Sequence, residues 1–162
     1  MPTLLDMNLP FQRAVDRYVG VPLCALCSLV DRVRPPAPLA VPPRRILIIL
    51  LSEMGSLVLA HALFARLKQR YPGASLHALV FAKNREALDL LGVMPPDHVL
   101  TVSDGSVPEF ASSAVAALRD VRALDFDIVI DCELFARISS LFSFLSGAPV
   151  RVGFYRHTQE GL

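Results

Sequence analysis

The sequence is poor in charged residues and in cysteine, and neither sign of charge is in clear excess. Charged residues make up 19% of its 162 residues and hydrophobic ones 53%, so the chain is expected to fold around a sizeable core rather than stay disordered. Its length suits one domain and is too short for two ordinary ones. A net charge of +1 argues against a general nucleic-acid-binding protein, which would carry a concentrated basic face.

Three cysteines are too few for a disulfide framework, and this usage fits a reducing cytoplasm. Cys24 and Cys27 form a C-x-x-C pair, but no predicted strand precedes it and no second pair or histidine cluster follows. We therefore interpret both as packing residues of a buried helix rather than as a redox or metal site. Cys132 is interpreted in the same way, and no metal site is predicted.

Residues 9–34 are predicted to form an N-terminal amphipathic helix. The residues that give the helical spacing are Phe11, Ala14, Val15, Tyr18 and Val19. The stretch 19–30 carries no charge, but twelve residues are too few to span a bilayer, which needs about twenty. Pro22 is expected to kink or restart the helix.

Basic residues gather around this helix. Residues 1–45 carry six arginines, no lysine and a net charge of +3, whereas the remainder carries −2. The arginines at its expected polar edges are Arg13, Arg17, Arg32 and Arg34. One interpretation is a helix at a membrane surface, and the other is a helix packed on the domain or on another protein. Apolar periodicity alone does not separate the two.

The chain divides into three regions. Residues 1–34 hold the amphipathic helix, and residues 35–43 (PPAPLAVPP) hold five of the thirteen prolines. Proline fixes the backbone and removes hydrogen-bond donors, so this second region is predicted to be a semi-rigid spacer. Residues 44–162 form the domain proper.

In the third region, apolar runs alternate with stretches of helical spacing. Strands are predicted at 46–51, 75–81, 98–102, 127–131 and 150–154. Helices are predicted at 57–71, 84–92, 108–123 and 133–147, with Asn84 as an N-cap and Gly92 as a C-cap. Repeated strand–helix–strand units predict an α/β fold with a Rossmann-like, doubly wound and mostly parallel sheet.

Ligands of such folds bind at the carboxyl ends of the strands. This rule selects four loops, which are Ser52–Ser56, Ala82–Arg85, Ser103–Val107 and Asp131–Glu133. The first loop, in LSEMGSLVLA, contains neither the dinucleotide fingerprint G-x-G-x-x-G nor the phosphate-binding G-x-x-x-x-G-K. We expect Gly55 to let the backbone bend there, and the amides of Ser56 and Leu57 to hold a phosphate or a sugar hydroxyl.

Two stretches of the sequence have a recognisable pattern. The first is RRILIILLSEMGSLVLAHALFARLKQRYPGASLHALV, where a strand runs into a Met-Gly loop and the next helix ends near Tyr-Pro. The second is FDIVIDCELFARISSLFSFLSGAPVRVGF, where a strand ends in an aspartate and a later short strand ends in Gly-Phe. Together they cover most of residues 44–154, and both resemble the heptosyltransferase-like glycosyltransferases of family 9.

The resemblance implies a GT-B glycosyltransferase, in which two Rossmann-like domains face each other across a cleft. It implies inverting, metal-independent transfer of a heptose-like sugar from a nucleotide sugar to a glycolipid or polysaccharide of the cell surface. This chain would be the N-terminal, acceptor-binding domain. The membrane interpretation of residues 9–34 would make it peripheral on the inner face of the cytoplasmic membrane. The donor domain is expected to lie outside these 162 residues, so no cofactor is predicted for the chain and alone it is expected to be inactive.

The family's catalytic base is the aspartate directly after the loop glycine, and here that position is Ser56. A serine hydroxyl is a poor base near neutral pH without a partner. Glu53 is the nearest carboxylate, and it becomes the candidate base for the acceptor hydroxyl. Its alternative role is that of a solvated loop residue or a helix-start acid. Met54 and Gly55 of the same loop are predicted to contact substrate.

Asp131 matches the family's strand-end aspartate, and its predicted role is to bind substrate or to organise the loop. Glu133 is spaced to join it in binding sugar hydroxyls, or else favours the start of the next helix. Two functions other than catalysis remain open. One is a non-catalytic Rossmann-like binding module, which Ser56 in place of aspartate favours, and the other is a membrane-attached scaffold.

Overall fold

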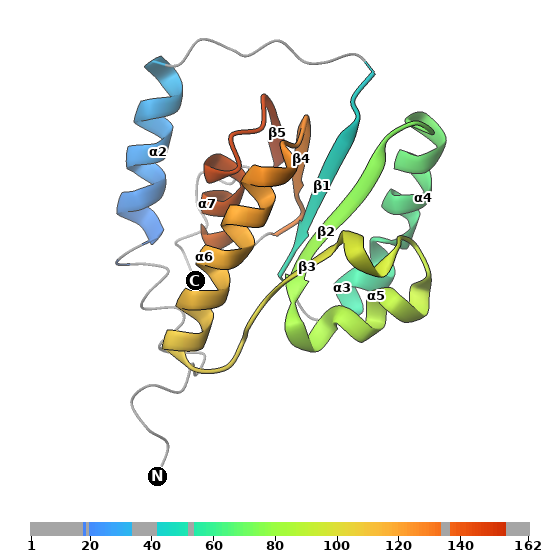
Figure 1. Ribbon diagram of the computed structural model, residues 1–162. Coiled ribbons are helices and arrows are strands. Elements are labelled where there is room, and N and C mark those ends of the chain that lie inside the picture. The colour runs from blue at the N-terminus through green and yellow to red at the C-terminus, as the bar shows by residue number, and fades with distance from the viewer. Residues whose placement is uncertain (1–17, 19, 34–41, 52–53, 134–136, 155–162) are drawn as a thin grey trace.

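The fold is a five-stranded parallel sheet with helices on both faces (Figure 1). The computed structural model describes residues 18, 20–33, 42–51, 54–133 and 137–154. The strands are β1 (Arg45–Leu50), β2 (Ser75–Phe81), β3 (Val99–Val102), β4 (Ile128–Asp131) and β5 (Val150–Gly153). Their order is β3-β2-β1-β4-β5, and all four pairings are parallel. The predicted Rossmann-like, doubly wound sheet is therefore confirmed.

Helices connect the strands in the predicted order. They are α3 (Met54–Leu59), α4 (His61–Arg70), α5 (Arg85–Leu91), α6 (Val107–Leu124) and α7 (Arg137–Leu145), with short 3₁₀ turns η2 (Ala82–Asn84) and η3 (Pro96–His98). The helix predicted at 57–71 starts earlier and is divided at Ala60. The strand predicted to begin at residue 98 begins at Val99, because His98 belongs to η3.

Strand β1 is apolar on both faces because helices cover the sheet on both sides. Ile46, Ile48 and Leu50 pack with Leu57 of α3 and Phe64 of α4. The alternate residues Leu47, Ile49 and Leu51 pack with Val121 of α6 and Phe142 of α7. Figure 1 shows α3, α4 and α5 on one side of the sheet and α6 and α7 on the other.

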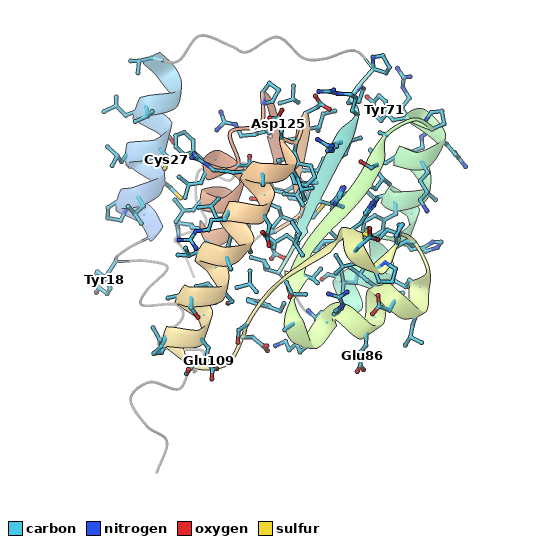
Figure 2. The ribbon with its side chains drawn as sticks, viewed as in Figure 1. Tyr18, Cys27, Tyr71, Glu86, Glu109 and Asp125 are labelled. Carbon is cyan, nitrogen blue, oxygen red and sulfur yellow. The ribbon has the colours of Figure 1, made fainter. Side chains whose placement is uncertain are left out.

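Local sequence signals mark two of the helix ends. Gly92 ends α5 with a left-handed backbone (φ 58°), as predicted. Ser106 and Glu109 form a capping box at the start of α6, at the lower end of that helix in Figure 2. Asn84 precedes α5 but its side chain makes no capping hydrogen bond, so the predicted cap is wrong in its mechanism.

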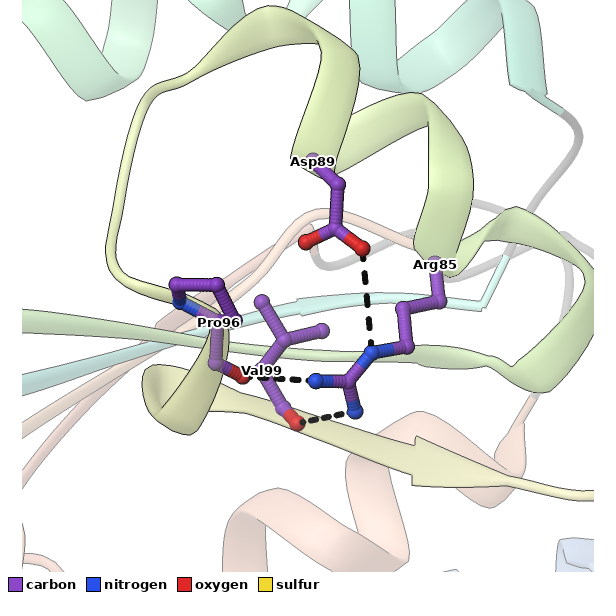
Figure 3. A network of polar contacts seen from close by, with 4 residues as sticks. All are labelled: Arg85, Asp89, Pro96 and Val99. Carbon is purple, nitrogen blue, oxygen red and sulfur yellow. Dashed lines mark hydrogen bonds and ion pairs between the residues drawn. The ribbon is translucent and has the colours of Figure 1, made fainter.

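Arg85 instead holds the start of α5 against the chain that enters β3 (Figure 3). Its guanidinium donates to the carbonyl oxygens of Pro96 at 2.8 Å and Val99 at 3.4 Å, and its Nε lies 3.8 Å from Asp89. Because all of these partners belong to neighbouring parts of the fold, Arg85 is a structural residue at the β3 edge of the sheet.

The amino ends of the strands are closed by side chains that bond main-chain groups. One carboxylate oxygen of the buried Asp127 accepts the amides of Arg44 at 2.7 Å and Arg45 at 2.9 Å. His77 is buried and stacks on His98, with ring centroids 4.0 Å apart. The Nδ1 atom of His77 is buried, and no described residue offers it a hydrogen bond.

Helix α2 (Val21–Val33) covers the part of the predicted N-terminal helix that the structure describes, apart from Tyr18 and Gly20, and it packs on α7. It begins just before Pro22, in agreement with the predicted restart. Cys24 and Cys27 are half-buried cysteines on its inner side. The helix as a whole is not buried as predicted, since several of its leucines are exposed. Among the described residues, no helix is both long and apolar enough to cross a membrane.

Candidate functional site

The switch point of the sheet lies between β1 and β4. The chain leaves β1 toward α3 on one face and leaves β4 toward α7 on the other, and Ile49 is paired with Asp131 in the register. Open α/β sheets bind ligands in the crevice that this divergence creates outside the carboxyl ends of the strands. Two of the four predicted loops, after β1 and after β4, meet there.

The loop after β1 is described only in its second part. Gly55 is exposed and Ser56 is half-buried, and both lie in the first turn of α3. The backbone of Gly55 is helical and a Cβ there would meet no atom within 4 Å, so the predicted need for glycine at a bend is wrong. Glu53 lies outside the described residues, as does the side chain of Met54, and their predicted roles stay predictions.

The loop after β4 is organised by Asp131, whose side chain is buried. Its Oδ1 accepts the amide of Glu133 at 3.0 Å, and its Oδ2 accepts the hydroxyls of Ser139 at 3.0 Å and Ser140 at 3.2 Å. Burial raises the pKa of Asp131 above its ordinary value, and these three hydrogen bonds partly oppose the rise. The loop-organising role predicted for Asp131 is therefore present in the structure.

Cys132 and Glu133 complete this loop. The Cys132 thiol is half-buried beside two carboxylates, and burial followed by their charges raises its pKa to about 11. A thiol with a raised pKa is mostly protonated near neutral pH and is a poor nucleophile. Glu133 is buried rather than solvated. The described part of α7 begins at Arg137, so the predicted role of Glu133 at the helix start stays a prediction.

An open groove of about 460 Å³ runs beside Asp131 between α7 and β5. Ser140 and Phe144 line its α7 side, and Arg151, Gly153 and Phe154 line its β5 side. The guanidinium of Arg151 lies over the Phe144 ring, 5.3 Å from its centroid. The groove therefore combines a carboxylate, a hydroxyl, a guanidinium and an exposed aromatic ring, the groups that commonly bind sugars or anions.

Gly153, which lines this groove, lies close against Asp131. It is paired with Asp131 in the parallel register, and a Cβ at this position would lie 3.3 Å from the Cβ of Asp131. Any larger side chain would press on the aspartate. The sequence predicted a strand ending in Gly-Phe here, but it gave no reason for the glycine.

The other two predicted loops are occupied by structural contacts. Lys83 after β2 pairs with Asp104 after β3 at 3.1 Å, which joins the two loops at the same edge of the sheet. Asn84, which follows Lys83, is buried.

The hydroxyl pair Ser139 and Ser140 was not predicted. Its visible signal in the sequence was two serines, one turn into the helix that follows a strand-end aspartate. Within the described ranges, no three histidine, cysteine or acidic side chains are grouped to hold a metal ion.

Comparisons with known proteins identify the fold. No protein-family model and no curated protein matches the sequence. Among solved structures, a family 9 glycosyl transferase from Veillonella parvula matches with a TM-score of 0.60 at 18% identity, over 68% of this chain and 32% of its own.

Two E. coli proteins match over 72% of this chain at 20% identity. The heptosyltransferase WaaC, in complex with ADP-2-deoxy-2-fluoro heptose, has a TM-score of 0.57 over 38% of its own chain. The ADP-heptose lps heptosyltransferase II has a TM-score of 0.56 over 32% of its own chain. The matched part thus spans about a third of the length of each of these solved structures. The chain has the fold of a corresponding part of the family 9 glycosyltransferases, as the sequence resemblance implied.

Proposed function

We propose that this chain is the acceptor-binding part of an inverting glycosyltransferase. It takes a glycolipid or polysaccharide of the cell surface, and a heptose-like sugar is transferred to it from a nucleotide sugar. The observation that carries the proposal is the groove beside Asp131, at the carboxyl end of β4, in a sheet that shares its fold with heptosyltransferases.

The groove suits the acceptor because its polar groups fit sugar hydroxyls. Ser140 donates to Asp131 and is exposed at the groove, so a sugar hydroxyl that enters there meets both a hydroxyl and a carboxylate edge. Arg151 on the facing strand supplies donors, and the exposed Phe154 ring supplies an apolar surface for a sugar face.

In this proposal, Glu53 acts as the base. The acceptor hydroxyl attacks the anomeric carbon of the donor sugar, Glu53 takes the hydroxyl proton, and the nucleotide leaves with the electrons of the broken bond. Both oxygens of Asp131 already accept hydrogen bonds, which favours a positioning role for it over proton transfer. The nucleotide sugar would be held by a second domain, in line with the share of the related enzymes that the chain covers.

Calorimetry on the 162-residue chain tests this assignment. De-acylated lipopolysaccharide core oligosaccharides should bind, and nucleotide sugars such as ADP-heptose should show no measurable affinity. Gly153→Val should weaken oligosaccharide binding about tenfold or more, because its side chain presses on Asp131 beside the groove. Gly73→Val is the matched control, since a Cβ at Gly73 meets nothing within 4 Å. Tight binding of a nucleotide sugar without oligosaccharide binding would reverse the assignment.

A non-catalytic binding module is the second candidate. Ser56 stands where the resemblance implies a catalytic aspartate, and Asp131 already accepts three hydrogen bonds from its own loop and from α7. In that case oligosaccharide binding would persist while a protein that also contains the donor domain shows no transfer.

A further inference from the structure

A second cavity lies beside the groove, between α2 and α7. Helix α2 packs on α7, and Figure 2 shows Cys27 on the side of α2 that is turned toward the domain. The cavity has a volume of about 120 Å³, and it is lined by Cys24, Cys27, Ser28, Ser140, Leu141 and Phe144. A single water needs roughly 10–15 Å³ of such space, and packed interiors leave few voids larger than that. The contact between α2 and α7 is therefore more open than ordinary helix packing.

The cavity and the groove share one wall. Ser140 and Phe144 line both of them, and the two residues lie four positions, or about 6 Å, apart along one face of α7. The hydroxyl of Ser140 donates to Asp131 at 3.2 Å, and the guanidinium of Arg151 in the groove lies over the Phe144 ring. A ligand seated beside Asp131 therefore borders the cavity.

The lining of the cavity suits a sugar unit. Cys27, Leu141 and Phe144 give it a mostly apolar wall. Ser28 and Ser140 are exposed, and they add one hydroxyl from each helix. None of the described side chains that line the cavity is charged, so a buried anionic group would lack a counter-charge there. A sugar has an apolar C–H face and hydroxyls at its edge, and such a lining matches both.

We infer that this cavity is a second subsite for the acceptor glycan, and we call it the α2 subsite. The inference rests on the proposed function. The sugar that receives the transfer lies beside Asp131, and the neighbouring sugar of the same glycan lies against Phe144 and reaches Cys27 and Ser28. Helix α2 then forms one side of the acceptor site, and it favours acceptors that have at least two sugar units.

Calorimetry on the 162-residue chain with a de-acylated lipopolysaccharide core oligosaccharide tests the α2 subsite. Cys27→Phe places a larger side chain in the cavity and should weaken binding about tenfold. Cys27→Ser keeps the size of the side chain and should bind like the wild type. The matched control is Leu26→Phe, which adds a ring at the neighbouring exposed position of the same helix and should also bind like the wild type. Circular dichroism should show all three variants folded.

Alkylation of Cys27 by iodoacetamide, followed by mass spectrometry, tests the subsite with α2 unaltered. Saturating oligosaccharide should slow the reaction of this half-buried thiol about fivefold or more, because a bound sugar covers it. A reference thiol on the other face of the sheet is introduced by Gln69→Cys at an exposed position of α4. That thiol should react at the same rate with and without the oligosaccharide.

The outcomes separate the α2 subsite from the proposed function. If either effect at Cys27 is absent while Gly153→Val still weakens binding, the subsite is overturned and the proposed function stands. If the unaltered chain binds no oligosaccharide, the proposed function falls and the subsite falls with it. If octyl glucoside slows the alkylation of Cys27 and the oligosaccharide does not, the cavity takes an alkyl chain, and the sugar subsite is again overturned.

Discussion

One buried aspartate lies at each end of strand β4, with Asp127 directly before the strand and Asp131 as its last residue, and the sheet is built differently around the two. At the amino end, Asp127 accepts two backbone amides at the start of β1, and stacked histidines lie nearby. At the carboxyl end, Asp131 accepts one amide and two side-chain hydroxyls of α7, and it borders an open groove.

The difference separates stability from function within one strand. Asp127 accepts hydrogen bonds from main-chain amides that would otherwise lack an acceptor, so its replacement should lower the free energy of unfolding. Two of the three partners of Asp131 are hydroxyls beside a groove, so its loss should appear mainly as altered binding. Substitutions at the two ends should therefore change different observables.

The largest effect on stability is expected for Asp127→Ala. The change leaves the amides of Arg44 and Arg45 without their acceptor, and hydrogen bonds to a charged group contribute roughly 1.5–3 kcal/mol each. We expect the free energy of unfolding to fall by about 3–5 kcal/mol in urea titrations. Asp120→Ala, an exposed carboxylate of α6, should change it by less than about 0.5 kcal/mol. Equal losses in both variants would remove the special role of the amino end.

A second effect at the amino end depends on pH. Burial, then the charges of His98 and Arg45, lower the pKa of His77 to about 4, although Asp97 opposes this. Between the unfolded value of about 6.5 and the folded value, the unfolded chain binds a proton that the folded chain refuses. Stability should therefore fall by roughly 3 kcal/mol as the pH drops from 6.5 to 4.

His77→Phe tests this because it keeps a ring between His98 and Phe126 but cannot titrate. Thermal unfolding across that pH range should lose this part of its pH dependence, whereas His61→Gln on the exposed side of α4 should retain it. An unchanged pH profile in His77→Phe would show that other groups cause the acid sensitivity.

At the carboxyl end, the largest effect is expected on turnover. In a protein that joins this chain to its donor domain, Glu53→Gln should lower turnover by roughly a hundredfold, the usual effect of losing a positioned general base. Ser56→Ala should cost much less, and Ser56→Asp should restore part of the rate in the Glu53→Gln background. Acceptor affinity is measured separately for each variant. Wild-type turnover in Glu53→Gln would place the base elsewhere.

Of these substitutions, Asp131→Asn should have the smallest effect on stability. The pH dependence of stability that Asp131 itself contributes should be opposite in sign to that of His77. Because burial raises the pKa of Asp131 in the folded state, the folded chain takes up this proton before the unfolded one, and acid favours folding through this group. At neutral pH the variant should change the free energy of unfolding by about 1 kcal/mol or less, because an amide of the same shape replaces the carboxylate. Oligosaccharide affinity should fall about tenfold. A large loss of stability without a loss of binding would make Asp131 a purely structural residue.

The sequence predicted the sheet well because its signals are local and periodic. Continuous apolar runs such as 46–51 mark strands that are buried on both faces, and Gly92 marks a helix end. The site was predicted only in outline. Asp131 could be placed at a strand end, but its bonds to Ser139 and Ser140 depend on the path of the chain between β4 and α7.

The periodicity of the sequence could not predict contacts between residues that are far apart in the chain. His77 lies within an apolar strand, and its stacking on His98 depends on where η3 brings the chain back to β2. The apolar residues of 21–33 were recognised as helical, but the periodicity does not reveal that the smaller Cys24 and Cys27 face α7 while the leucines face outward.

Hydrogen–deuterium exchange with and without a de-acylated lipopolysaccharide core oligosaccharide tests the central claim most directly. The account predicts slower exchange at the carboxyl end of the sheet, in residues 54–57, 131–133 and 150–154. It predicts no change at the amino end, in residues 42–46 and 75–78. Protection at the amino end, or protection of the carboxyl end by ADP-heptose in place of the oligosaccharide, would contradict it.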